Sequence, residues 1–190
     1  MVSFRANLIS EQYITKKNDD NSYSKIPVSF VRLNSNDKEE VMIIRETAAN
    51  WRYGDEYAGN IADCMIENFY YKPENNDQFY AIAKQSADLE NLKPDDILAL
   101  ALKSTSSTGE ECIDYAQIEP KYVATLPEYI LGGKLAHYKR IGSALFDGIE
   151  ALFKEKTLCL FSMQNTLDYY IKRGYKKVTE GPVYKMVLKR

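Results

Sequence analysis

A glycine-containing turn before the clearest amphipathic segment of the chain is the feature best suited to bind a ligand. Lys139 and Arg140 precede the run from Ile141 to Ala144. A helix that begins here leaves the N–H groups of its first turn without partners inside the helix, beside the positive end of its dipole. The pattern therefore predicts a phosphate-binding turn to which the two cations contribute. The alternative explanation of Gly142 is close packing of the helix start against a sheet.

The composition excludes several other chemistries. His137 is the single histidine, so multi-histidine metal sites are excluded, and no metal is expected. Cys64, Cys112 and Cys159 are odd in number and far apart in the sequence, so we expect neither a disulfide framework nor a zinc cluster, and a reduced, intracellular setting. With 25 Lys and Arg against 27 Asp and Glu, the chain lacks the positive surplus of nucleic-acid binding proteins.

Length and hydropathy predict one soluble domain. The 190 residues, 45% of them hydrophobic, can bury one sizeable core. No apolar run approaches the roughly 18 residues of a membrane span, and the N-terminus lacks the pattern of a signal peptide. We therefore expect a cytoplasmic protein that does not bind membranes.

The periodicity of apolar residues predicts the elements that position the turn. Residues 1–27, with a polar stretch at 16–24, are expected to form an N-terminal extension or hairpin, and residues 28–190 the domain proper. Strands are predicted at 28–33, 78–83, 97–102, 112–119, 157–163, 175–178 and 183–188, and helices at 37–51, 55–70, 139–155 and 166–173. This order predicts an α/β (α+β) fold with one mixed central sheet, three consecutive antiparallel strands, a parallel crossover and helices on both faces.

Three of these helices have a predicted buried stripe. The expected buried residues are Val41, Ile44, Ala48 and Trp51 in the first helix, Tyr57, Ile61, Cys64, Met65 and Phe69 in the second, and Ile141, Leu145, Ile149 and Leu152 in the third.

Two stretches of the C-terminal half resemble the GCN5-related N-acetyltransferase (GNAT) family. IEP at 118–120, followed by HYKRIGSAL at 137–145, is similar to the strand and acyl-CoA motif Q/R-x-x-G-x-G/A of that family. His137 stands at the Gln/Arg position, Arg140 at the first Gly and Gly142 at the last Gly. The run LCLFSMQNTLDYYIKRGYKKV at 158–178 is similar to its next strand, Asn, helix and Y-x-x-x-G-F/Y motif.

The resemblance, which covers roughly residues 28–188, implies an N-acetyltransferase that moves an acetyl or other acyl group from acyl-CoA to an amine of a small molecule or protein. Tyr170 is then expected to protonate the CoA thiolate and Asp114 to act as general base, with Glu119 in reserve. The implied donor contacts are Ile118 through its backbone, His137, Tyr138, Lys139, Arg140, Ile141, Gly142, Ser143, Ala144, Asn165 and Tyr170.

Each assignment has a simpler alternative. Tyr170 is one tyrosine among 15, and a core position would also explain it. Asp114 is also explained as a solvated strand carboxylate, and His137 as a loop residue. The acceptor is expected near Trp51, Tyr53, Asp55 and Glu56.

Two other functions are compatible with the sequence. The first is a non-catalytic GNAT-like domain that binds a protein partner, whereas the enzyme is expected to be a monomer or homodimer. The second is a nucleotide-binding enzyme of another family, which the lack of a complete G-x-G-x-x-G or G-x-x-x-x-G-K-[ST] motif disfavours.

Overall fold

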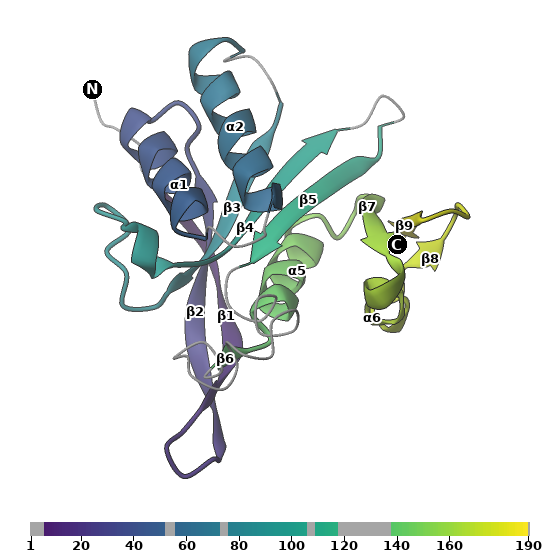
Figure 1. The fold of residues 1–190 in the computed structure, drawn as a ribbon, viewed down its shortest axis with the longest axis horizontal. Coiled ribbons are helices and arrows are strands. Elements are labelled where there is room, and N and C mark those ends of the chain that lie inside the picture. Colours follow the sequence, from purple (N-terminus) through teal and green to yellow (C-terminus); the bar gives the residue numbers. More distant parts are fainter. Residues whose placement is uncertain (1–5, 52–55, 73–75, 106–108, 118–137, 190) are drawn as a thin grey trace.

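Within the residues that it describes, the computed structural model contains one mixed sheet of nine strands, with helices on both faces (Figure 1). The structure describes residues 6–51, 56–72, 76–105, 109–117 and 138–189, and only the backbone of residues 56–57 and 114–117. The strands follow one another in the order β6-β1-β2-β3-β4-β5-β7-β9-β8. The predicted α/β fold with a mixed central sheet is confirmed.

The elements have the following bounds. The strands are β1 Asn7–Lys17, β2 Tyr23–Leu33, β3 Gln78–Lys84, β4 Ile97–Thr105, β5 Glu111–Gln117, β6 Tyr138–Lys139, β7 Leu158–Met163, β8 Lys176–Lys177 and β9 Val183–Leu188. The helices are α1 Lys38–Asn50, α2 Glu56–Tyr70, α5 Ile141–Leu152 and α6 Leu167–Lys172, with 3-10 turns η1 at Pro94–Asp96 and η3 at Gln164–Thr166.

The N-terminal residues form a hairpin that belongs to the central sheet. β1 and β2 pair antiparallel over almost their full lengths, and β2 continues the sheet through β3. Ile14 of β1 is 1% exposed and lies in the core beside Phe30 and other residues of the same cluster. The predicted domain boundary at residue 28 therefore lies inside β2.

α1 and α2 pack on one face of the sheet. Val41, Ile44 and Trp51 of the first predicted stripe are buried, and Ala48 is half-buried. In the second stripe Ile61 and Met65 are buried, while Cys64 and Phe69 are half-buried against the same cluster; the side chain of Tyr57 lies outside the described residues. Both stripes therefore point to the sheet, as their helical spacing predicted.

α5 packs on the opposite face. Ile141, Leu145 and Ile149 are buried as predicted. Leu152 is not: it is 41% exposed. The prediction was wrong there because Leu152 is the last residue of α5, where the helix ends and the stripe no longer faces the sheet.

Gly148 sets the distance between α5 and the sheet. A Cβ atom at this position would lie 2.6 Å from a ring atom of Phe30 in β2. Real Cβ contacts are not that short, so only glycine fits without a shift of the ring or of the helix. Gly148 therefore allows α5 to pack closely against β2.

The strand connections follow the predicted pattern. β3, β4 and β5 are consecutive antiparallel neighbours, and β5 and β7 are parallel neighbours joined through α5. The closing strands β8 and β9 pair antiparallel, with β9 next to β7. None of the helices in the described ranges is long and apolar enough to cross a membrane.

Candidate functional site

Strands β5 and β7 are paired at one end only. Their parallel register contains Glu111 opposite Leu158 and Cys112 opposite Cys159, although both strands continue beyond these residues. From there β5 stays paired with β4, and β7 with β9, so the two strands diverge (Figure 1). We call this opening the β5–β7 splay. As far as the chain is described, the facing strand edges have no strand partner, and an extended ligand with amide groups can pair with such edges.

The first turn of α5 lies beside the open end of the splay. Ser143 in this turn accepts a hydrogen bond from the hydroxyl of Tyr169 at 3.3 Å, and Tyr169 belongs to α6, which follows β7 through η3. The carboxyl end of β7 and the amino end of α5 are therefore close together. Ser143, a predicted donor contact, lies at this junction.

The residue before α5 has an unusual backbone conformation. Arg140 is the N-cap of the helix, with φ 70° and ψ 18°, in the left-handed region that favours glycine. Its carbonyl accepts from the amide of Ala144 at 2.9 Å, which begins the helix. The backbone thus takes a glycine-type conformation at the position where the resemblance puts the first glycine of the acyl-CoA motif.

Among the described residues, no side chain caps the start of α5. Arg140 makes no capping hydrogen bond, and the first turn contains no acidic residue. The N–H groups of Ile141, Gly142 and Ser143 have no partner within the helix by geometry. They lie at the positive end of the dipole of a 12-residue helix, so an anion is favoured here.

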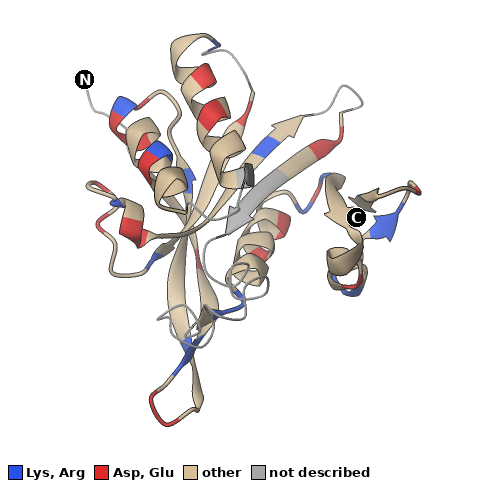
Figure 2. Cartoon of the chain, viewed as in Figure 1, with Lys and Arg blue, Asp and Glu red and all other residues tan. Residues whose placement is uncertain are grey.

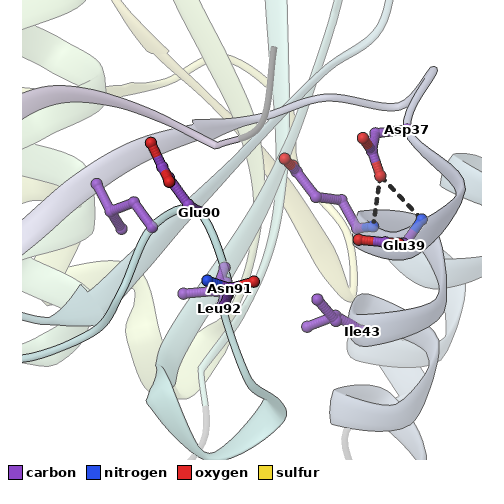
Figure 3. Close-up of a pocket in the computed structure, with 8 residues that line it drawn as sticks. Asp37, Glu39, Ile43, Glu90, Asn91 and Leu92 are labelled. Carbon is purple, nitrogen blue, oxygen red and sulfur yellow. Dashed lines mark hydrogen bonds between the residues drawn. The ribbon is translucent and has the colours of Figure 1, made fainter. Parts of the chain in front are cut away.

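The start of α1 provides a contrast within the same chain. The carboxylate of Asp37 accepts from the amides of Glu39 and Glu40, at 2.9 and 3.2 Å (Figure 3). The side chain of Glu40 also accepts from the amide of Asn34 at 2.7 Å. A cavity of about 190 Å³ next to this turn is lined by these carboxylates and by Glu90. The negative charge disfavours a phosphate at α1, whereas α5 has no such groups in its first turn.

Basic residues gather where the β1–β2 hairpin meets β6, whereas α2 has acidic residues and no lysine or arginine (Figure 2). The ammonium of Lys139 donates to the hydroxyl of Tyr23 at 2.7 Å and lies over its ring. This hydrogen bond, followed by the charges of Lys139 and Lys17, lowers the pKa of Tyr23. Lys25 lies over the ring of Tyr13 on the same hairpin. The ammonium of Lys139, just before α5, is thus held by Tyr23.

A second cavity, of about 340 Å³, adjoins β6. Tyr138, another predicted donor contact, lines it together with residues from β2, β4, the end of β3 and the turn after β3. The other lining residues are Ile26, Pro27, Val28, Lys84, Gln85, Ser86 and Leu98. Its wall is apolar along β2 and β4 and polar at the end of β3 and in the turn that follows, a combination that suits a ligand with both kinds of surface.

Tyr170 lies in the core. Its side chain is 1% exposed, and its ring makes edge contacts with those of Phe146, Tyr169 and Tyr175, at 5.5, 5.1 and 5.8 Å between centroids. The hydroxyl group that contacts the first turn of α5 belongs to Tyr169 instead. Sequence reasoning missed Tyr169 because two adjacent tyrosines on a short helix do not reveal which of them faces the neighbouring helix.

An ion-pair cluster fixes α6 against α5. The guanidinium of Arg173 donates to Glu150 at 3.0 Å and to Asp147 at 2.7 Å. Burial lowers the pKa of Arg173, but the hydrogen bonds to Glu150 and Asp147 outweigh it and raise the pKa overall. The same guanidinium lies over the rings of Phe146 and Tyr169. The position of Tyr169 relative to α5 is therefore well determined.

The remaining predicted residues have different outcomes. Asn165 is exposed in η3, at the carboxyl end of β7. The backbone of Asp114 lies in β5 opposite Leu102, and its side chain is outside the described residues. Trp51, expected near the acceptor, is only 3% exposed and belongs to the core. Ile118, His137, Glu119, Tyr53 and Asp55 lie wholly outside the described residues, as does the side chain of Glu56.

The fold is shared with solved acetyltransferase structures. No family model matches the sequence, and the search of curated proteins finds no relative. A proposed GNAT-family acetyltransferase from Desulfovibrio desulfuricans matches with a TM-score of 0.53 at 11% identity, over 84% of this chain and 96% of that one. A GNAT-family acetyltransferase from Staphylococcus aureus Mu50 matches with a TM-score of 0.52 at 11% identity, over 85% and 99%. The chain therefore has a GNAT-like fold.

Proposed function

We propose that the chain is an acyl-CoA-dependent N-acyltransferase that transfers an acetyl group from acetyl-CoA to an amine. The main support is the β5–β7 splay, which opens beside the uncapped, acid-free first turn of α5. An acyl-CoA presents an anionic diphosphate and an extended arm with amide groups, and these match the two parts of this site. The GNAT-like fold supports the same assignment.

The diphosphate binds to the N–H groups at the start of α5. The amides of Ile141, Gly142 and Ser143 donate to it, and Lys139 and Arg140 supply positive charge beside them. Ala144, whose amide already donates to the carbonyl of Arg140, lines the same turn beside the diphosphate. Tyr138 and His137 precede these residues and flank the donor. The pantetheine arm lies in the splay along β5, and the backbone N–H of Ile118 donates to the acyl oxygen.

Proton transfer completes the reaction. Attack of an amine on a thioester needs a deprotonated nitrogen and a proton for the departing thiolate. Tyr170 supplies that proton, Asp114 accepts one from the amine directly or through water, and Asn165 contacts the donor at the end of β7. The acceptor is an amine of a small molecule or a protein, and the enzyme acts in the cytoplasm as a monomer or homodimer.

A turnover assay tests this proposal. Full-length protein is mixed with acetyl-CoA and a panel of amines, including polyamines, amino sugars and peptides with free N-termini or lysines, and release of free CoA thiol is followed. We expect amine-dependent release with at least one member of the panel. Absence of thiol release with every amine, in protein that binds acetyl-CoA, would contradict the enzymatic assignment.

Two adjacent tyrosines provide a matched comparison. Tyr170→Phe should lower kcat by about 100-fold, the lower end of the usual contribution of a general acid, with little change in the KM for acetyl-CoA. Tyr169→Phe removes the hydroxyl that contacts Ser143, so it should mainly raise the KM for acetyl-CoA. Equal, small effects of both variants would remove Tyr170 from the mechanism.

A non-catalytic GNAT-like domain that binds a protein partner is the second candidate, and the burial of Tyr170 favours it. A ring packed against Phe146, Tyr169 and Tyr175 is explained by its place in the core and needs no part in proton transfer. Under this hypothesis the protein forms a complex with its partner, and Tyr170→Phe leaves the affinity of that complex unchanged. Loss of partner binding in the same variant would count against it.

A further inference from the structure

Cys112 and Cys159 meet at the base of the β5–β7 splay. They lie opposite each other in the last of the two parallel pairs that join the strands. Their sulfur atoms are 2.8 Å apart, and both residues are free thiols in this structure. This pair cannot be recognised from the sequence alone, because 46 residues separate the two cysteines along the chain.

The backbone already has the geometry that a disulfide needs. Neighbouring strands of a sheet lie about 4.8 Å apart, within the range of about 4.4 to 6.8 Å between Cα atoms that a disulfide spans. An S–S bond is about 2.05 Å long, so the two sulfurs must approach by less than 1 Å. Rotation of the side chains can supply this, and the strand pairing need not change.

The surroundings give the two thiols different roles. Cys112 is half-buried and therefore reachable by a small oxidant, whereas Cys159 is 0% exposed. Burial, and then the hydrogen bond to Cys112, raise the pKa of Cys159 to about 12. Lys185 of β9 acts in the opposite direction, but it is paired with Glu110 at 2.6 Å, just before β5. Cys112 is thus the thiol that reacts first.

We propose that Cys112 and Cys159 are an oxidation site, which a peroxide converts to a reversible disulfide across the base of the β5–β7 splay. The sulfur of Cys112 attacks one oxygen of hydrogen peroxide, the O–O bond breaks, and water leaves, giving a sulfenic acid on Cys112. The sulfur of Cys159 then attacks this sulfur. The S–O bond breaks, and hydroxide departs with the thiol proton of Cys159 as a second water. Two thiols lose two electrons and two protons, and one peroxide is reduced to two waters.

The disulfide would fix the strands at the point from which they diverge. Among the described residues, the two pairs at Glu111 and Cys112 are the only direct pairing between β5 and β7. A covalent bond there ties β7, β9 and β8 to the rest of the sheet without closing the splay. The oxidation site does not depend on the proposed function, so either can fail without the other.

Peptide mapping of the oxidised wild-type protein tests the proposal. Reduced and desalted protein is treated with hydrogen peroxide, the remaining thiols are blocked with N-ethylmaleimide, and the protein is digested with trypsin without reductant. Cys112 and Cys159 lie on peptides 104–121 and 157–172, and Cys64 lies on a third. We expect a linked product of 104–121 and 157–172, lighter than their sum by two hydrogen atoms and abolished by dithiothreitol.

Two variants sharpen the result. Cys64→Ala should give the same linked product in the same yield. In Cys159→Ala no second thiol can react with the sulfenic acid on Cys112, so Cys112 should be oxidised further to sulfinic acid. The proposal is overturned if wild-type Cys112 becomes sulfinic acid without a linked product, or if Cys64 appears in the main cross-link. It is equally overturned if N-ethylmaleimide still labels Cys112 and Cys159 of the folded protein after treatment with a peroxide concentration that oxidises the same cysteines in the urea-unfolded chain.

Discussion

Replacement of Arg140 by glycine should separate folding stability from ligand affinity. Arg140 has φ 70°, and a side chain in the left-handed region costs about 1–2 kcal/mol, a cost that glycine avoids. Glycine also increases the entropy of the unfolded chain, which offsets about 0.5–1 kcal/mol of this gain in stability. We therefore expect Arg140→Gly to stabilise the fold by about 0.5–1 kcal/mol, a rise in Tm of about 1–4 °C for a chain of this size.

Arg140→Ala is the matched control for backbone strain. It shortens the same exposed side chain but retains the Cβ that makes the left-handed conformation costly. The guanidinium makes no hydrogen bond or ion pair within the described ranges, so its loss should change the free energy of unfolding by less than about 0.5 kcal/mol. The free energy of unfolding of Arg140→Gly should therefore exceed that of Arg140→Ala by about 1 kcal/mol.

The affinity for acetyl-CoA, in contrast, should depend on the charge at position 140 and not on the backbone strain there. Glycine and alanine both remove a cation from beside the start of α5, and an exposed cation near a phosphate contributes about 0.3–1 kcal/mol. Both variants should bind acetyl-CoA about two- to five-fold more weakly, and Arg140→Lys should bind as the wild type does. Urea unfolding and calorimetric titration measure the two quantities on the same preparations. Equal stability of the glycine and alanine variants would refute the strained conformation of Arg140.

Three further predictions concern the core and the strand junction. Gly148→Ala should destabilise the fold by about 1–2 kcal/mol in urea unfolding, because the added Cβ meets the ring of Phe30; an unchanged midpoint would mean that helix and sheet separate freely. In the wild type the ammonium of Lys103 lies 2.6 Å from the carboxylate of Glu111, and both side chains are buried. Lys103→Met leaves this carboxylate buried without its cation, so it should lower the free energy of unfolding by about 3 kcal/mol in urea unfolding. A second change, Glu111→Leu, should restore most of that loss. The pKa of Cys159 is raised from 9.0 to about 12, so the unfolded chain loses this proton first and stability should fall as pH rises from about 9 to about 12. Urea midpoints at about pH 8 and about pH 10.5 measure that fall, which should be smaller in Cys159→Ala; an equal fall in both proteins would assign it to other groups.

Elements with a repeating apolar face could be predicted from the sequence. Val41, Ile44 and Trp51 lie on the predicted side of α1 because a helix packed along a sheet buries one stripe for its whole length. The same rule failed at Leu152, where α5 ends. β1 was expected only as part of an extension or hairpin, because it is paired near the edge of the sheet and Ile14 is its only buried residue. A strand with one buried side chain does not show an alternating pattern.

The site could be predicted only in part, because its main features depend on strand register and backbone conformation. The turn before α5 was found from Gly142 and its two neighbouring cations, and it begins a helix as expected. The left-handed conformation of Arg140 has no signal in the residue type, since arginine rarely adopts it. The meeting of Cys112 and Cys159 follows from the parallel register of β5 and β7, which the sequence does not specify.

The most direct test of the central claim is a calorimetric titration of the purified chain with acetyl-CoA. The wild type should bind saturably, at about one equivalent, with a Kd below about 100 μM, a modest affinity for a ligand of this size. A double variant, Gly142→Asp with Ser143→Asp, places negative charge at the amides proposed to hold the diphosphate and should abolish binding while the fold remains intact. Absence of wild-type binding up to about 1 mM acetyl-CoA, or equal binding by the double variant, would contradict the account.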